Sequence, residues 1–273
     1  MISRFSPAKA NLFFRVLSKR PDGFHEVASL YTALSLGDFI HLKLEEKDSF
    51  SSNIPSLLDD DSNLIIQARD SFRTATGILD SVSIQLEKII PIGAGLGGGS
   101  SNAATLLWSM NELFGKPLAI DQMITLGAVI GSDVPFFFSK GSAYCRGRGE
   151  ILKEMNFKME EPFWIAKPDM YSLSTPKVYS VCKPNEVSNE ELFFINDLEP
   201  AAFRILPELK QFKEDLKNLG FSNVVMTVSG TAFLCFGDIE EPKLSNTTFY
   251  SVTTIRRELN NWYGDAYDNT YSC

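Results

Sequence analysis

The sequence predicts an α+β protein built as two unequal lobes around a cleft. At 273 residues the chain exceeds the usual size of one hydrophobic core, so two lobes are the natural expectation. Segments of alternating polarity are interspersed with segments of helical periodicity, which is the layout of an α+β fold. The composition changes after Gly149, so we predict an N-terminal domain over residues 1–153 and a C-terminal domain over residues 154–273.

The first half of the chain carries several strand and helix patterns. Period-two alternation predicts strands, and apolar residues at helical spacing predict helices. An acidic, serine-rich segment at residues 45–62 predicts a solvated loop. The predicted strands span residues 10–17, 39–44, 81–86 and 134–138, and the predicted helices span residues 63–75, 102–114 and 120–130.

The second half carries fewer and weaker patterns. A helix begins at Pro207 and ends near Gly220, where proline and glycine act as start and stop signals. The remaining predictions are a strand at residues 163–166, apolar runs at 224–228 and 232–236, a strand at 249–255 and a frayed tail at 265–273.

The composition excludes several classes of function. The 26 Lys and Arg residues against 34 Asp and Glu residues give a net charge of −8, which argues against nonspecific binding to nucleic acid or to an anionic membrane. No apolar run approaches the roughly 20 residues that span a bilayer. The four cysteines form no CxxC pair, so neither a zinc site nor a disulfide framework is indicated. We expect a cytoplasmic protein with reduced thiols.

A glycine-rich segment between a predicted strand and a predicted helix is the most informative part of the sequence. Without Cβ atoms its backbone can curl so that several N–H groups converge, and the next helix turns its positive end toward the same point. A di- or triphosphate is the expected ligand. The loop consists of Pro91, Ile92, Gly93, Ala94, Gly95, Leu96, Gly97, Gly98, Gly99, Ser100 and Ser101.

Three other interpretations of this loop are weaker. A flexible surface turn does not explain five glycines joined directly to an apolar helix. The GxGxxG dinucleotide fingerprint matches at residues 93–98, but the required βαβ context and the acidic residue about 20 positions later are missing. A Walker A loop fails because Gly99 stands where that motif requires lysine.

Two further segments carry isolated charged residues. Lys9 stands at the entrance of an apolar strand, and alone it would be a strand-end lysine whose charge reaches solvent. Asp133 stands between a helix end and the apolar run at 134–138, and alone it would be a turn or capping aspartate.

In this order, PxAKxN, PxGxGLGGGSS and GxDVPFF resemble the motifs of the GHMP kinases, named for galactokinase, homoserine kinase, mevalonate kinase and phosphomevalonate kinase. Within them the chain is most similar to the branch that acts on 4-diphosphocytidyl-2-C-methyl-D-erythritol in the non-mevalonate isoprenoid pathway. Further segments that carry the resemblance are residues 23–25, 37–38, 61–64, 147–151 and 174–176.

Two positions depart from the family pattern. The C-terminal glycine motif of the family reads Val-Ser-Gly-Thr at residues 228–231, so one glycine is missing and the contribution of this loop is open. Phe24 replaces a tyrosine, which keeps an aromatic face and loses a hydroxyl.

The resemblance implies a ribosomal S5 domain 2-like N-terminal lobe, a smaller α+β C-terminal lobe and an active site in the cleft. It implies ATP as phosphoryl donor, carried with Mg²⁺, and no dedicated protein metal site. Asp133 would take the proton of the acceptor's C2 hydroxyl, and Lys9 would draw the γ-phosphate. Asn63 and Lys88 would lie at the adenine, although a helix N-cap and a surface lysine are equally good interpretations of these two residues.

For the acceptor, the resemblance implies that Phe24 and Tyr179 sandwich a cytosine while His25 reads its edge. Tyr31 and Asn11 would line the methylerythritol end. The partner is then a small molecule, a cytidine diphosphate sugar alcohol, and the protein is a monomer or homodimer. Two alternatives stay open: a GHMP kinase for homoserine or a mevalonate derivative, and a catalytically silent ligand-binding member.

Overall fold

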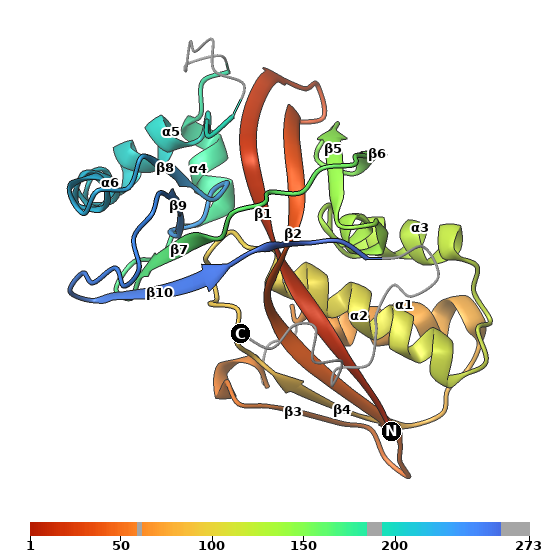
Figure 1. The fold of residues 1–273 in the computed structure, drawn as a ribbon. Helices are drawn as coiled ribbons and strands as arrows, with labels where there is room; N and C mark the ends of the chain where they lie inside the picture. Colours follow the sequence, from red (N-terminus) through yellow and green to blue (C-terminus); the bar gives the residue numbers. More distant parts are fainter. Residues whose placement is uncertain (59–61, 185–192, 258–273) are drawn as a thin grey trace.

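The computed structural model describes residues 1–58, 62–184 and 193–257, and in this part of the chain two β-sheets carry the helices (Figure 1). The larger sheet has the order β3-β4-β2-β5-β6, and both β1 and β11 also pair with β2. Only the β3–β4 pair is parallel among its pairings. Its strands are β1 (Ile2–Lys19), β2 (His25–Leu44), β3 (Ser49–Ser52), β4 (Val82–Glu87), β5 (Ser142–Arg146), β6 (Ile151–Glu154) and β11 (Thr254–Ile255).

The helices of the first half lie together beside the β1–β2 pair (Figure 1). Asn63 caps α1 by accepting a bond from the Ile65 amide at 3.0 Å, and Gly77 ends the helix in a left-handed conformation. The buried side chains of these helices form one core with those of β2 and β4. These helices are α1 (Leu64–Thr76), α2 (Gly98–Leu113), α3 (Ile120–Ile130) and the 3₁₀ helix η2 (Val134–Phe138).

The smaller sheet is antiparallel, with the order β10-β7-β9-β8. Its strands are β7 (Phe163–Pro168), β8 (Asn223–Met226), β9 (Phe233–Phe236) and β10 (Thr247–Val252). The helices near it in Figure 1 are α4 (Thr175–Val181), α5 (Glu199–Ile205) and α6 (Glu208–Asn218). The α+β class is confirmed. The boundary after residue 153 stays a prediction. Strand β11, from the predicted C-terminal domain, pairs with β2 of the larger sheet.

Several predicted elements need correction. The helix after the glycine cluster begins at Gly98 and not at residue 102, so its first turn is made of loop residues. Residues 134–138 form a 3₁₀ helix and not a strand, because Pro135 favours a helical first turn and packing buries the following phenylalanines. The predicted loop at 45–62 contains β3 and the short 3₁₀ helix η1 (Pro55–Leu57), and β5, β6, α4 and α5 were not predicted. The tail at 265–273 lies outside the described residues.

The long β1–β2 pair joins the two halves of the fold. One core cluster packs Leu12 of β1 and Leu34 of β2 against Ile165 and Leu234 of the smaller sheet, and Leu96 of the glycine loop belongs to the same cluster. The glycine loop is therefore held between the two sheets. Within the described ranges, none of the helices combines the length and the apolar character that a bilayer crossing requires.

Candidate active site

The glycine loop forms one wall of a cavity of about 300 Å³. Gly97 has a φ of 67°, a left-handed conformation that suits glycine, and α2 begins at the next residue. A Cβ atom on Gly97 would lie 2.8 Å from Cγ of Lys9, so space also requires glycine here. The free N–H groups and the positive end of α2 make this cavity suited to phosphate groups. Of the residues predicted to bind ATP, those lining it are Asn63, Lys88, Pro91, Ile92, Gly93, Ala94, Gly95, Leu96, Gly97, Gly98, Gly99 and Ser100.

The buried carboxylate of Asp38 supports both ends of this loop. It accepts hydrogen bonds from the Ile89 amide at 2.7 Å, the Ile90 amide at 2.8 Å and Nδ2 of Asn102 at 2.8 Å. The ammonium of Lys88 lies 2.6 Å from the same carboxylate. The Lys88 side chain is only 7% exposed, so its interpretation as a surface lysine is wrong, and burial lowers its pKa.

Two predicted ATP-binding residues have other contacts as well. The Ser101 side chain is fully buried, accepts a bond from the Ser6 hydroxyl at 2.9 Å and lines neither this cavity nor the larger one described below. Asn63 caps α1 and also lines the cavity wall, so its contact with adenine stays a prediction.

Lys9 and Asp133 meet beside the loop, although they come from distant segments. Lys9 follows a β-bulge in β1 and its amide bonds to the Leu96 carbonyl at 2.9 Å, which attaches the strand to the glycine loop. Its Nζ lies 3.4 Å from Oδ2 of Asp133 and 2.6 Å from Oδ1 of Asn11. Lys9 is 1% exposed, so the strand-end interpretation with a solvated charge is wrong. Asn11 lies behind Lys9 and lines neither the cavity at the glycine loop nor the larger one described below.

Tyr31 holds the second oxygen of Asp133. Its hydroxyl donates to Oδ1 of Asp133 at 3.2 Å, and its ring lies 4.7 Å from Nζ of Lys9. Burial, followed by the charge of Asp133, raises the pKa of Tyr31 well above its ordinary value, so the phenol stays protonated and remains a donor. Asp133 makes no side-chain capping bond to η2, and the capping interpretation is therefore wrong.

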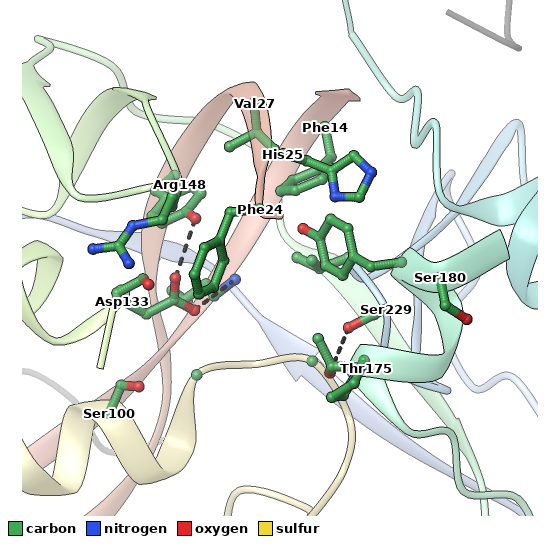
Figure 2. Close-up of a pocket in the computed structure, with 18 of the residues that line it drawn as sticks. Phe14, Phe24, His25, Val27, Ser100, Asp133, Arg148, Thr175, Ser180 and Ser229 are labelled. Carbon is green, nitrogen blue, oxygen red and sulfur yellow. Dashed lines mark hydrogen bonds and ion pairs between the residues drawn. The ribbon is translucent and has the colours of Figure 1, made fainter. Parts of the chain in front are cut away.

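A larger cavity of about 670 Å³ has Lys9 and Asp133 on its wall. Phe24, His25, Asp133 and Arg148 are among the residues that line it (Figure 2). Phe24 is 53% exposed, which leaves a large aromatic face for a ligand. The rings of His25 and Tyr179 lie 5.2 Å apart, so three of the residues predicted to bind the acceptor's base share this cavity.

The side chains of His25 and Tyr179, which lie with Phe24 at the aromatic end of this cavity, are in their neutral forms at neutral pH. Burial, with a smaller contribution from the charge of Lys19, lowers the pKa of His25 below its usual value. Burial also raises the pKa of Tyr179 far above its usual value. Both side chains can therefore hydrogen-bond or stack without a charge of their own.

The two cavities meet at the glycine loop. Gly95, Gly97 and Ser100 line both of them, while Lys9 and Asp133 line the larger one. The end of a phosphate chain held by the loop would thus lie near Lys9 and Asp133. A ligand in the larger cavity would contact the same two residues. This arrangement suits the transfer of a phosphoryl group between two ligands.

Several residues of the larger cavity were not predicted from the sequence, above all Lys19 and Arg148. The guanidinium carbon of Arg148 lies 4.9 Å from the centre of the Phe24 ring. Its only sequence signal was its place between two glycines in the 147–151 segment. With Lys9 and Asp133, the charged side chains on the wall are three cations and one carboxylate, so this cavity favours an anionic ligand although the chain has a net charge of −8.

The segment that corresponds to the C-terminal glycine motif, at residues 228–231, packs against the glycine loop. The Thr227 hydroxyl donates to the Ala94 carbonyl, and a Cβ atom on Gly230 would collide with the backbone of Ala94 and Gly95. Val228, where the family motif has glycine, adopts a φ of 41°. A β-branched residue is strained in this left-handed region, so the conformation of Val228 has an energetic cost.

Among the described residues we find no reactive thiol and no metal centre beside this site. Cys145 and Cys235 are buried free thiols, and burial raises the pKa of Cys145 strongly, which keeps its thiol protonated and unreactive. In residues 1–58, 62–184 and 193–257, the structure has no group of three or more His, Cys, Asp or Glu side chains arranged to hold a metal ion.

The fold and the site together define a small-molecule kinase. Residues 63–141, which contain the glycine loop and Asp133, match the family described as GHMP kinases N terminal domain. A crystal structure of mevalonate kinase superposes with a TM-score of 0.67 over 94% of this chain and all of its own length, at 15% identity, which shows the shared fold.

Two more similar proteins narrow the assignment. The chain is 43% identical over 270 residues to the 4-diphosphocytidyl-2-C-methyl-D-erythritol kinase of Protochlamydia amoebophila, covering 96% of this chain and 93% of the relative. A crystal structure of 4-(cytidine 5'-diphospho)-2C-methyl-D-erythritol kinase superposes with a TM-score of 0.78 at 30% identity, covering 93% of this chain and 99% of that one. The chain belongs to the 4-diphosphocytidyl-2-C-methyl-D-erythritol kinase family of the GHMP kinases.

We predict that Val228→Gly stabilises the protein, because glycine adopts the φ of 41° without strain. Relief of about 1 to 3 kcal/mol of strain, less about 0.4 to 1 kcal/mol of unfolded-chain entropy, should raise the free energy of unfolding by about 1 kcal/mol. Thermal melting should show a midpoint about 2 to 4 °C higher. The control Val129→Gly, at an exposed helical position, should lower the midpoint or leave it unchanged. A Val228→Gly midpoint at or below that of the unchanged protein would contradict the strain argument.

Proposed function

We propose that the protein transfers the γ-phosphoryl group of ATP to the C2 hydroxyl of 4-diphosphocytidyl-2-C-methyl-D-erythritol. The observation that carries this proposal is the meeting of two cavities at one glycine loop, with Lys9 and Asp133 at their junction. The names of the similar proteins, at 43% and 30% identity over most of their lengths, supply the acceptor.

The donor's phosphates bind the glycine loop in this proposal. The backbone N–H groups of the loop and the positive end of α2 hold them, and the adenine lies against the wall that contains Asn63 and Lys88. Magnesium belongs to the proposal as a chelate with ATP, since it keeps most of its waters and needs few protein ligands. The Ser100 hydroxyl and the Asp133 carboxylate are the side chains that fit this ion, which when bound neutralises charge on the phosphoryl oxygens.

The transfer step needs an acceptor oxygen in line with the γ-phosphorus and a place for its proton. The acceptor oxygen forms a bond to phosphorus as the bond to the bridging β–γ oxygen breaks, and ADP leaves. Asp133 takes the hydroxyl proton and later releases it to solvent. Lys9 offsets the charge of both the carboxylate and the phosphoryl group, and the Tyr31 phenol orients the carboxylate from its other oxygen.

The acceptor's base occupies the aromatic end of the larger cavity. Phe24 and Tyr179 offer the faces between which a cytosine can stack, and the neutral imidazole of His25 can bond to its edge. Tyr31 lines the hydroxyl end beside Asp133, and Asn11 acts from behind by holding Lys9.

The wider setting of the protein is also part of the proposal. We expect a cytoplasmic monomer or homodimer that binds no nucleic acid, in keeping with the acidic composition. We expect an ATP-binding and catalytic domain over residues 1–153 and a C-terminal domain over residues 154–273.

The direct test of this function is phosphorylation of 4-diphosphocytidyl-2-C-methyl-D-erythritol by ATP and Mg²⁺, followed by phosphorus NMR. A new phosphomonoester signal and equal formation of ADP are the expected result. Phosphorylation of homoserine or mevalonate with no change in the cytidylyl acceptor would transfer the assignment to another GHMP kinase. No turnover of any acceptor by folded, ATP-binding protein would favour a silent ligand-binding member.

We predict that Asp133→Asn lowers kcat by about 10²- to 10⁴-fold, because asparagine can accept a hydrogen bond but cannot take the proton. A value near the lower limit fits a loose phosphoryl-transfer transition state. Melting temperature, affinity for both substrates and kcat should be measured on one preparation. Asp80→Asn, at an exposed site outside both cavities, is the control and should leave kcat unchanged. Near-normal kcat in well-folded Asp133→Asn protein would remove this residue from the mechanism.

We predict that Tyr179→Ala weakens acceptor binding by about 1 to 3 kcal/mol, the usual contribution of a base stacked on an aromatic ring. ATP affinity should barely change, since Tyr179 lines only the larger of the two cavities. Tyr179→Phe keeps the ring and should bind the acceptor nearly normally. If isothermal titration shows a loss of ATP binding with intact acceptor binding, the assignment of Tyr179 to the acceptor's base is wrong.

A further inference from the structure

We propose that Arg148 binds the diphosphate of the acceptor, and that it selects a ligand in which an anionic linker joins the base to the reacting hydroxyl. The inference rests on the proposed function, because it assigns a further residue to the same acceptor cavity. Its basis is the position of Arg148 on the cavity wall, the rigidity of the turn that carries it and the lack of a strong partner for its charge.

The turn between β5 and β6 spans the distance between the two ends of the cavity. Arg148 stacks its guanidinium on Phe24, at the aromatic end. The next residue, Gly149, lies at the hydroxyl end: a Cβ atom there would be 2.8 Å from the Tyr31 hydroxyl and 3.8 Å from Oδ1 of Asp133. Arg148 therefore lies on the cavity wall with Phe24 on one side and, through its neighbour Gly149, Tyr31 and Asp133 on the other.

The backbone of this turn is anchored to β2. The Gly147 carbonyl accepts from the Val27 amide at 2.8 Å, and the Gly147 amide donates to Oε1 of Glu26 at 3.1 Å. The Arg148 amide donates to Oε2 of Glu150 at 2.6 Å. The turn is thus held in place next to His25, and Arg148 is presented to the cavity from a rigid support.

The charge of Arg148 is only weakly neutralised by the protein. Its Nε lies 3.6 Å from Oε1 of Glu150, a long contact, and the two terminal nitrogens have no bonded partner among the described residues. Asp22 also faces it, because the charge of Arg148 contributes to lowering the pKa of that carboxyl group. A guanidinium with free N–H groups matches the oxygens of a phosphate in a two-point arrangement.

The other cations of the cavity lie at its two ends. Lys9 is bonded to Asn11 and paired with Asp133 at the hydroxyl end. Lys19 lies at the aromatic end, where its charge helps to lower the pKa of His25. Among the cations that line the cavity, Arg148 is the one placed to meet a diphosphate between these ends.

The alternative role for Arg148 is to support the exposed ring of Phe24 without touching the ligand. The two roles differ in how binding depends on ligand charge. Support of Phe24 affects cytidine and cytidine diphosphate equally, since both carry the base. Binding of the diphosphate affects only the charged ligand.

The experiment measures the affinity of cytidine and of cytidine diphosphate by isothermal titration, with a non-hydrolysable ATP analogue saturating the glycine loop. Arg148→Ala should weaken cytidine diphosphate binding by about 10- to 100-fold, the effect of losing a hydrogen-bonded charge pair, and cytidine binding by less than about threefold. Arg148→Lys should give an intermediate loss for the diphosphate. Arg146→Ala removes the same charge two positions away, at an exposed site outside the cavity, and should change neither affinity.

Three results decide the inference. Equal losses for both ligands in Arg148→Ala would assign Arg148 to the support of Phe24 and overturn it. Unchanged protein that binds the diphosphate no better than cytidine would overturn it too, even if phosphorylation of the acceptor succeeds. If the phosphorylation test fails but the diphosphate-selective loss is observed, the proposed function falls while the assignment of Arg148 to the diphosphate stands.

Discussion

The buried carboxylate of Asp38 is the interaction on which the glycine loop depends. One side chain on β2 receives the two amides before the loop, through Ile89 and Ile90, and the Asn102 amide in α2 beyond it. A buried carboxylate is stable only when such donors and a cation, here Lys88, replace the water it has lost. Because both ends of the loop are tied to one point, its glycines are confined to the curl between strand and helix.

Close backbone packing then aligns the loop with the reacting groups. The β-bulge of β1 brings the Lys9 amide to the loop, and the absence of a side chain at Gly97 leaves room for the lysine stem. From the smaller sheet, Gly230 packs on Ala94 and Gly95 in the same way. These close contacts leave no room for a Cβ atom, so they hold the loop in position where the two cavities meet, and in-line transfer between two ligands depends on such positioning.

The larger cavity carries a charge opposite in sign to the net charge of the chain. The protein is acidic overall, yet the wall of the larger cavity carries Lys9, Lys19 and Arg148 with a single carboxylate. Local fields in a cleft with low-dielectric walls exceed those set by net charge, so an acidic protein can still attract a polyanionic acceptor. The neutral His25 and Tyr179 add recognition of a base without adding charge.

Local patterns and family motifs in the sequence were enough to predict the α+β class, the helix over 120–130, the cap at Asn63 and the glycine loop, because short-range periodicity and backbone freedom are properties of neighbouring residues. Lys9 and Asp133 were found only because motifs similar to a known family contain them. Packing between distant segments decided the rest: the start of α2 at Gly98, the strained backbone of Val228 and the stacking of Arg148 on Phe24. Each of these depends on which residues the fold brings next to each other, and no pattern within one segment carries that information.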